Sequence, residues 1–181
     1  MGLSSSFLAR PAAPLQRIVL TGFMGSGKTT TGPLVAKRLG WRFVDVDDAI
    51  EAEAGCSIAA LFSREGEAAF RNREHAMILR LMHAEGLVLA LGGGAIERAE
   101  TREFLLKTPG TRLVHLEVEL ATALDRCRGT ELTRPVLADQ ANLAARYSRR
   151  IPLYRMAHVS ICVDTLTPDE TAEAILSAVS A

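Results

Sequence analysis

The chain of 181 residues has little of what several classes of protein require. Its 21 basic and 21 acidic side chains balance to a formal net charge of +0, which argues against a nucleic-acid binder that relies on bulk positive charge. No apolar run approaches the length needed to cross a bilayer. The three cysteines, Cys56, Cys127 and Cys162, are widely spaced and form no C-x-x-C pair, as in an intracellular protein with reduced thiols. We therefore expect a cytoplasmic protein with no membrane or nucleic-acid partner.

The length suits one domain with a sizeable core, because a hydrophobic content of 48% is ordinary for a soluble globular protein. No internal repeat or low-complexity tract is visible. Residues 1–16 contain a run of three serines and two prolines, and we predict that they form a mobile arm. Residues 17–181 then form the single domain.

The most informative stretch is GFMGSGKTT, from Gly22 to Thr30, which fits the phosphate-loop pattern G-x-x-x-x-G-K-[ST]. A short apolar run, residues 17–21, precedes it as a buried strand would, and apolar residues follow at helical spacing over residues 30–39. Glycines allow backbone N–H groups to turn toward phosphates, and the new helix adds its positive end. Lys28 can reach the outer phosphates of a nucleotide, and the hydroxyl of Thr29 can ligate Mg²⁺.

Short apolar strands alternate with helical patterns along the rest of the chain. This alternation predicts an α/β fold with a five-stranded parallel sheet and helices on both faces, a three-layer α/β/α arrangement. Ligands of such sheets gather at the carboxyl ends of the strands, so the residues that follow each strand are the candidates for a site. The expected strands are residues 17–21, 41–45, 87–91, 112–117 and 159–163, and the expected helices are residues 30–39, 58–62, 67–82, 121–128, 141–155 and a last one with Pro168 in its first turn.

Carboxylates follow the second strand. Strand alternation places Asp45 and Asp47 on one side, near the phosphate loop. Two such carboxylates suit the support of hydrated Mg²⁺ and the removal of a proton from an attacking hydroxyl. Asp48 precedes a helical stretch, and we interpret it as the cap of that helix.

Three consecutive glycines, Gly92, Gly93 and Gly94, follow the third strand, where they let a ligand approach the backbone and offer N–H donors. On the helix before that strand, Glu74 is three residues after Arg71 and can orient its guanidinium. Taken alone, this pair is also typical of a solvent-exposed contact. The same holds for Arg149 and Arg150, which a basic helix face would explain.

A polar segment with prolines, residues 129–140, is interpreted as a lid that contains Arg134. A kinase must exclude water during transfer, because ATP is otherwise hydrolysed. An arginine that closes over the site would also offset charge on the phosphoryl group. The four histidines have no spacing typical of metal ligands.

Together these features resemble the shikimate kinase family, from about residue 17 to the end of the chain. The order and spacing of the features are more specific than the phosphate loop alone. They are Gly25-Ser26-Gly27-Lys28-Thr29, Asp45-x-Asp47, Phe70-Arg71, Gly92-Gly93-Gly94, Arg134-Pro135 and Arg150-x-Pro152-Leu153-Tyr154.

On the nucleotide side, the resemblance implies that ATP and Mg²⁺ bind at the phosphate loop. Lys28 and the loop amides hold the phosphates, Thr29 binds the metal, and Asp45 supports the metal through water. Arg134 belongs to the lid and touches the phosphates. The implied nucleotide-binding residues are Gly25, Ser26, Gly27, Lys28, Thr29, Thr30 and Arg134, and either Arg126 or Arg128 is the candidate to contact adenine.

On the acceptor side, the resemblance implies that shikimate is phosphorylated at its 3-hydroxyl by a monomeric enzyme. Asp47 binds ring hydroxyls and acts as the base, and Arg71, Arg150 and the turn from Gly92 to Gly94 hold the substrate. The two arginines also make sense by themselves, because guanidinium groups match a carboxylate in bidentate geometry. The implied catalytic residues are Lys28, Asp47 and Arg134.

Two other functions compete with this hypothesis. Another small P-loop kinase, specific for gluconate or a nucleotide, would share Lys28 and Thr29 but would not need Arg71, Arg150 and the three glycines together. A module that binds ATP or shikimate without turnover is the rival of a different class. The acid, the lysine and the lid arginine weigh against it.

Overall fold

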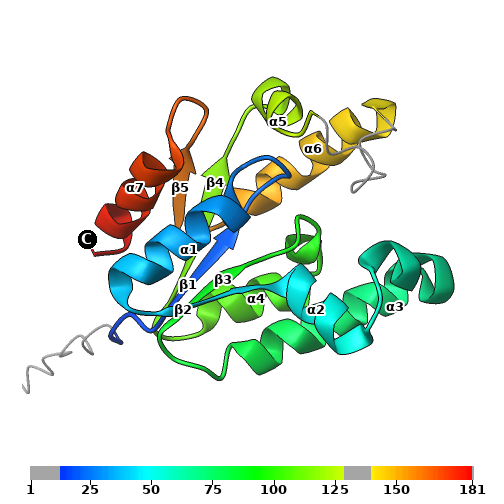
Figure 1. Ribbon diagram of the computed structural model, residues 1–181, viewed down its shortest axis with the longest axis horizontal. Coiled ribbons are helices and arrows are strands. Elements are labelled where there is room, and N and C mark those ends of the chain that lie inside the picture. Colours follow the sequence, from blue (N-terminus) through cyan, green and yellow to red (C-terminus); the bar gives the residue numbers. More distant parts are fainter. Residues whose placement is uncertain (1–12, 129–139, 181) are drawn as a thin grey trace, which may run out of the picture.

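The computed structural model describes residues 13–128 and 140–180. In this part of the chain, five strands form one sheet in the order β2-β3-β1-β4-β5, and every neighbouring pair is parallel. The five-stranded parallel sheet predicted from the sequence is therefore confirmed (Figure 1). The strands are β1 (Arg17–Thr21), β2 (Arg42–Asp45), β3 (Leu87–Ala90), β4 (Thr111–Glu117) and β5 (Val159–Cys162).

The central strands lie inside the core because both faces of the sheet are covered. Ile18, Val19 and Leu20 of β1 are 0% exposed, and Val19 pairs in register with Leu89 of β3 and Leu113 of β4. Strands buried on both faces read as continuous apolar runs, which is why the sequence pattern located them.

Helices cover the two faces of the sheet. Figure 1 shows α1 in front of the sheet with α7 packed beside it, and α4 behind the sheet. Right-handed crossovers between parallel strands require this division, because the chain moves in opposite directions along the sheet after β1 and after β3. None of the described helices has both the length and the apolar character that a bilayer span requires. The helices are α1 (Lys28–Leu39), α2 (Val46–Ala54), α3 (Ile58–Leu81), the 3₁₀ turn η1 (Ala95–Glu97), α4 (Ala99–Lys107), α5 (Leu120–Arg126), α6 (Gln140–Tyr154) and α7 (Pro168–Ser180).

Two sequence-based expectations about helices differ from the structure. The sequence pattern did not identify the helix between the third and fourth strands, which is α4. Only Thr101 and Leu105 of α4 are buried, so its apolar stripe is too thin to be seen in the sequence. Asp48 does not cap α2. The cap is Asp45, whose side chain accepts a hydrogen bond from the Asp47 amide, and Asp47 therefore lies in the first helical turn rather than on the strand.

The segments expected to surround the domain are described only in part. Residues 1–12 of the predicted arm and residues 129–139 of the predicted lid, including Arg134, lie outside the described residues. Gln16, at the end of the arm, is attached to the domain. Its backbone N–H donates to the Gly110 carbonyl at 2.7 Å, and its side chain donates to Glu85 at 2.8 Å.

Candidate active site

The phosphate loop connects β1 to α1 and forms one side of a pocket of about 370 Å³. Gly25 has a φ of 74°, and a Cβ at this position would lie 2.6 Å from the carbonyl oxygen of Ala123, so only glycine fits there. The helix that follows begins at Gly27, which provides no side-chain cap, and the first residues of α1 line the pocket. A helix N-terminus that opens onto a pocket is suited to anionic groups.

Lys28 places its ammonium group within the turn of the phosphate loop. Its Nζ donates hydrogen bonds to the carbonyl oxygens of Gly22 at 2.7 Å and Phe23 at 3.0 Å. The pocket thus combines a localised positive charge with the positive end of α1, and this combination can hold the phosphates of a nucleotide.

Thr29 and Asp45 bring two oxygen donors together beside this pocket. The Thr29 hydroxyl donates to Asp45 Oδ2 at 2.9 Å, while Asp45 Oδ1 caps α2. Hard oxygen donors fit Mg²⁺, which uses one or two protein ligands, keeps several waters and is completed by phosphates. Among the described residues, no group of three His, Cys, Asp or Glu side chains could hold a metal by itself. The donor set therefore fits a Mg²⁺ ion that arrives with a nucleotide.

Asp47 lies between the phosphate loop and a second group of charged residues. Burial, followed by the charge of Asp45, raises the pKa of Asp47 to about 6, whereas the positive charges of Lys28 and Arg71 act in the opposite direction. A carboxylate with a pKa near the operating pH can accept a proton and release it again, as a general base must.

The three glycines after β3 provide the space in which the charged side chains meet. A Cβ at Gly92 would lie 2.7 Å from both Asp47 Oδ1 and Glu74 Oε1. A Cβ at Gly94 would overlap the guanidinium of Arg71. None of the three has a positive φ, so glycine is needed at Gly92 and Gly94 for room and not for backbone conformation.

The third predicted side chain, Arg150, also lies at this turn. A Cβ at Gly93 would lie 3.5 Å from its Nη1. The hydroxyl of Tyr154, which is fully buried, donates to the Gly93 carbonyl at 2.5 Å. The structure therefore brings Asp47, Arg71 and Arg150 together around one turn, although they come from α2, α3 and α6.

Arg71 is held by the partner that the sequence pattern suggested. Its Nη1 donates to Glu74 Oε2 at 2.7 Å, and its guanidinium lies 5.2 Å from the ring centroid of Phe70. Glu74 is only 2% exposed, so burial raises its pKa to about 7, against the effect of Arg71. The alternative for Arg71 and Glu74, a solvent-exposed contact, is therefore wrong, because Glu74 is buried.

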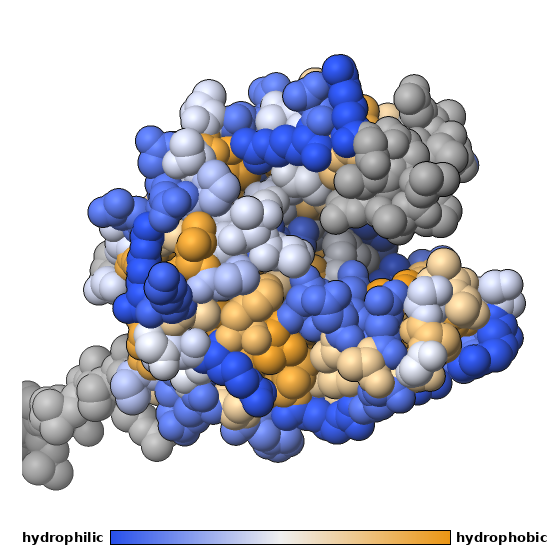
Figure 2. All heavy atoms as spheres, viewed as in Figure 1, coloured by the Kyte–Doolittle hydropathy of each residue, from blue (hydrophilic) through white to orange (hydrophobic). Residues whose placement is uncertain are grey.

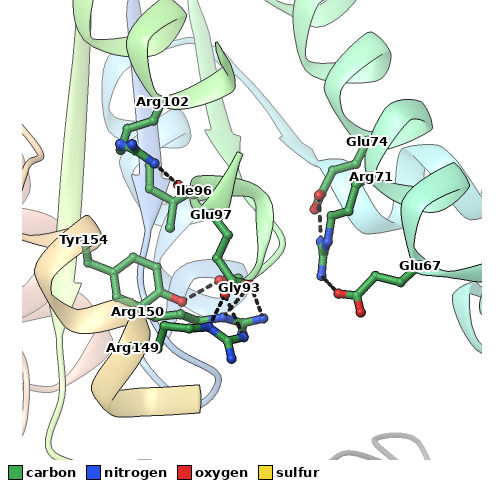
Figure 3. Close-up of polar contacts among 10 residues, drawn as sticks. All are labelled: Glu67, Arg71, Glu74, Gly93, Ile96, Glu97, Arg102, Arg149, Arg150 and Tyr154. Atoms are coloured by element: carbon green, nitrogen blue, oxygen red, sulfur yellow. Dashed lines mark hydrogen bonds and ion pairs between the residues drawn. The ribbon is translucent and has the colours of Figure 1, made fainter. Parts of the chain in front are cut away.

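Sequence reasoning missed Glu97. It lies in η1 and accepts hydrogen bonds from both Arg149 and Arg150 (Figure 3). The arginines are more than 50 positions away in the chain, so no local pattern could have revealed the contact. Figure 3 shows the two ion-pair groups on opposite sides of the site, with Arg71, Glu67 and Glu74 on the α3 side and Arg149, Arg150 and Glu97 on the other.

A second pocket, of about 480 Å³, opens between these two groups and is lined by residues of α3, η1 and α6, among them Arg71, Glu97 and Arg149. Figure 2 shows the molecule hollowed beside the α2–α3 region, with hydrophilic residues along that edge of the opening. One pocket lies at the phosphate loop and the other lies at Arg71 and Glu97, so the structure offers places for two ligands.

The structure distinguishes the two arginines that the sequence left open. Arg126 lines the first pocket, and its Nη2 donates to the Val163 carbonyl at 2.7 Å. Arg128 pairs with Asp125, and its side chain is 82% exposed. Of the two, Arg126 is therefore the one at the nucleotide pocket.

Comparison with known proteins connects this geometry to a family. The family model described as shikimate kinase matches residues 24–180. Among curated proteins, the shikimate kinase of Symbiobacterium thermophilum is 45% identical over 152 residues, which cover 81% of this chain and 86% of the relative.

Solved structures agree. The shikimate kinase from Acinetobacter baumannii in complex with shikimate has a TM-score of 0.85 and 37% identity, over 92% of this chain and 93% of that one. The shikimate kinase from Bacteroides thetaiotaomicron has a TM-score of 0.84 and 30% identity, over 92% of this chain and 99% of that one.

Proposed function

The chain belongs to the shikimate kinase family, and from this premise we propose how its residues phosphorylate shikimate. The reaction transfers the γ-phosphoryl group of ATP to the 3-hydroxyl of shikimate, and it yields shikimate 3-phosphate and ADP for aromatic amino-acid synthesis. The observation that carries the proposal is the position of Asp47, between the Lys28 pocket on one side and Arg71 on the other.

The nucleotide binds with its phosphates at the loop of Gly25, Ser26 and Gly27 and at the first turn of α1, which includes Thr30. Lys28 moves from the loop carbonyls to the phosphate oxygens, a short displacement because its ammonium already lies within the loop. Arg126, at the same pocket, contacts the nucleoside part. Arg134 closes over the phosphates as part of a lid.

The metal in this proposal is Mg²⁺, held directly by Thr29 and through water by Asp45. Asp45 is ready for this role because its two oxygens already bond to Thr29 and to the start of α2, which fixes the carboxylate. When bound, Mg²⁺ offsets the charge on the phosphates.

Shikimate binds at the triple-glycine turn, beside the second pocket, with its carboxylate between Arg71 and Arg150. Two guanidinium groups are suited to one carboxylate, since each offers parallel N–H donors. The turn from Gly92 to Gly94 brings the backbone close to the ring, because a side chain at Gly92 would displace Asp47 and one at Gly94 would displace Arg71. The ring hydroxyls then face Asp47.

In the transfer step, the 3-hydroxyl oxygen forms a bond to the γ-phosphorus as the bond from that phosphorus to the bridging oxygen of ADP breaks. The hydroxyl proton passes to Asp47. Most of the acceleration comes from the placement of the two substrates in line and from Lys28 and Arg134, which stabilise charge on the phosphoryl oxygens.

We also propose that one domain, residues 17–181 with a lid at residues 129–140, acts as a monomer in the cytoplasm. The residues that carry the proposal, Lys28, Asp47 and Arg71, all come from one chain. All three cysteines are within the described residues and no disulfide joins them, in keeping with a reducing compartment. Sedimentation of the purified protein would measure its assembly state.

The function is tested by coupled measurement of ADP release with shikimate, gluconate and nucleoside monophosphates in parallel. We expect turnover with shikimate alone, and a product whose mass has increased by one phosphoryl group. Turnover with one of the other acceptors instead would establish a different P-loop kinase. Binding of ATP and shikimate without product would establish a sensor.

Replacement of Arg71 by lysine should raise the KM for shikimate about 10- to 100-fold, because lysine keeps the charge but loses the paired N–H donors. The KM for ATP should stay close to that of wild type, since Arg71 lies at the acceptor pocket. Steady-state kinetics with each substrate varied in turn would measure both constants. Arg80→Lys is the matched control, since Arg80 is on the same helix and pairs with the exposed Glu53. An unchanged KM for shikimate in Arg71→Lys would remove this residue from the acceptor site.

A further inference from the structure

Glu97 forms ion pairs with two arginines on the acceptor side, although it was not among the residues implied by the sequence. Its Oε2 accepts from Arg150 Nε at 3.0 Å and from Nη2 at 2.8 Å, so one carboxylate oxygen engages two N–H groups of the same guanidinium. Its Oε1 accepts from Arg149 Nε at 2.9 Å. The carboxylate is thus shared between two neighbouring residues of α6 (Figure 3).

The two arginines of this group differ in burial. The side chain of Arg150 is 8% exposed and that of Arg149 is 64% exposed, whereas Glu97 is intermediate at 22%. A buried guanidinium needs a nearby negative charge, because it has lost most of its hydration. Burial acts to raise the pKa of Glu97, but Arg150 and Arg149 together hold it below its usual value, so the carboxylate is ionised at neutral pH.

The contact determines which part of Arg150 remains available to a ligand. Glu97 occupies the edge formed by Nε and Nη2. The remaining terminal nitrogen, Nη1, lies beside Gly93, at the turn where Asp47 and Arg71 also lie. Glu97 therefore orients the guanidinium so that Nη1 lies at the triple-glycine turn.

Glu97 itself is rigidly placed. Its backbone N–H donates to the Gly94 carbonyl at 3.0 Å, which ties it to the triple-glycine turn. Arg102 of α4 donates to the Ile96 carbonyl at 2.8 Å, and this contact supports the backbone next to Glu97. Tyr154 bonds to Gly93 one helical turn after Arg150, so α6 is attached to the glycine turn at two points.

We propose that Glu97 is a positioning residue for the acceptor, which holds Arg150 in the orientation that binds the carboxylate of shikimate. The inference rests on the proposed function. Arg71 is held by Glu74 in the same manner, so each substrate-binding arginine has its own internal carboxylate. A long side chain that is already ordered loses less conformational freedom when the substrate binds. Arg149 holds the second oxygen of Glu97 and keeps it from rotating away.

The test is the replacement Glu97→Gln, which keeps the shape and removes the charge. We expect the KM for shikimate to rise about tenfold, while kcat and the KM for ATP stay within about twofold of wild type, since uniform binding of the acceptor is what is lost. Glu103→Gln is the matched control, because it removes an acid from an exposed pair with Lys107 on α4. Denaturant unfolding of both variants would show whether stability has changed.

Two further measurements separate positioning from a merely structural role. With the methyl ester of shikimate as acceptor, which has no carboxylate, Glu97→Gln and wild type should have the same KM. In an Arg150→Gln background, the additional change Glu97→Gln should have little effect, because Glu97 acts through Arg150.

The outcomes are distinguishable from failure of the proposed function. If the wild-type protein makes no shikimate 3-phosphate, the function itself is rejected. If it does, an unchanged KM for shikimate in Glu97→Gln would overturn the inference. A lower KM would also overturn it and would identify Glu97 as a competitor of the substrate for Arg150. An equal rise in KM for shikimate and for its ester would also overturn the inference, because Glu97 would then stabilise the turn and not orient Arg150 toward the carboxylate.

Discussion

The Asp47→Asn variant is expected to lose about 10²- to 10⁴-fold in kcat, the range that a general base contributes. Asparagine keeps the size of the side chain but cannot accept the proton of the 3-hydroxyl. ATP binding should persist, because the phosphate loop is unaltered. Single-turnover measurements with saturating ATP would isolate the transfer step, and titration with a fluorescent ATP analogue would confirm binding. Turnover close to that of wild type would reject Asp47 as the base.

The pKa of Asp47 adds a dependence on pH to this expectation. Burial, followed by the charge of Asp45, raises the pKa to about 6, so kcat/KM of the wild type should fall tenfold per unit as pH drops below about 6. The activity falls at low pH because Asp47 can accept a proton only when it is ionised. In Asp47→Asn, this limb of the profile should disappear from the residual activity.

The same shift predicts the effect of the variant on stability. The pKa of Asp47 in the folded protein, about 6, is above the value of 3.8 that is ordinary for an aspartate in an unfolded chain, so the native state binds more protons between these values. The contribution of Asp47 to stability therefore falls as pH rises through this window, and the ionised side chain is destabilising above it. At pH 8, the free energy of unfolding of Asp47→Asn should equal that of wild type or exceed it by on the order of 1 kcal/mol. Its urea midpoint should therefore be the same or higher. A large loss of stability would mean that the kinetic defect reflects misfolding.

The Lys28→Ala variant is expected to lose about 10³-fold or more in kcat/KM, because it removes a positive charge from the transferring phosphoryl group in a site where water is excluded. The fold should survive. Lys28 is on the first turn of α1, and its ammonium donates to the carbonyls of Gly22 and Phe23 and to the Ser26 hydroxyl, which belong to the loop itself. Coupled ADP release would measure the activity, and circular dichroism would confirm the helical content.

Lys37→Ala is the control for this change, because Lys37 is exposed in the last turn of the same helix. It should have wild-type kinetics. If Lys28→Ala retained activity close to that of the control, Lys28 would have no part in phosphoryl transfer, and the P-loop would serve only to shape the pocket.

The sequence by itself determined the features that depend on neighbouring residues. The central strands were found because they contain continuous apolar runs, residues 18–20 and 87–91. The phosphate loop was found because the glycines, Lys28 and Thr29 act from one short segment. The partnership of Arg71 with Glu74 was found because residues three apart on a helix are neighbours.

Only the tertiary structure decided the contacts between segments that are far apart in the chain. The pairing of Glu97 with Arg150 depends on how α6 packs against η1, and no periodic pattern encodes it. The choice of Arg126 over Arg128 depends on which side of α5 faces the loop at Gly25. The need for glycine at Gly92 and Gly94 became apparent as space for Asp47, Glu74 and Arg71, which the fold brings there from two helices. The physical reason is common to these cases: short-range patterns specify elements, whereas the room, charge and orientation of a site arise when the elements pack together.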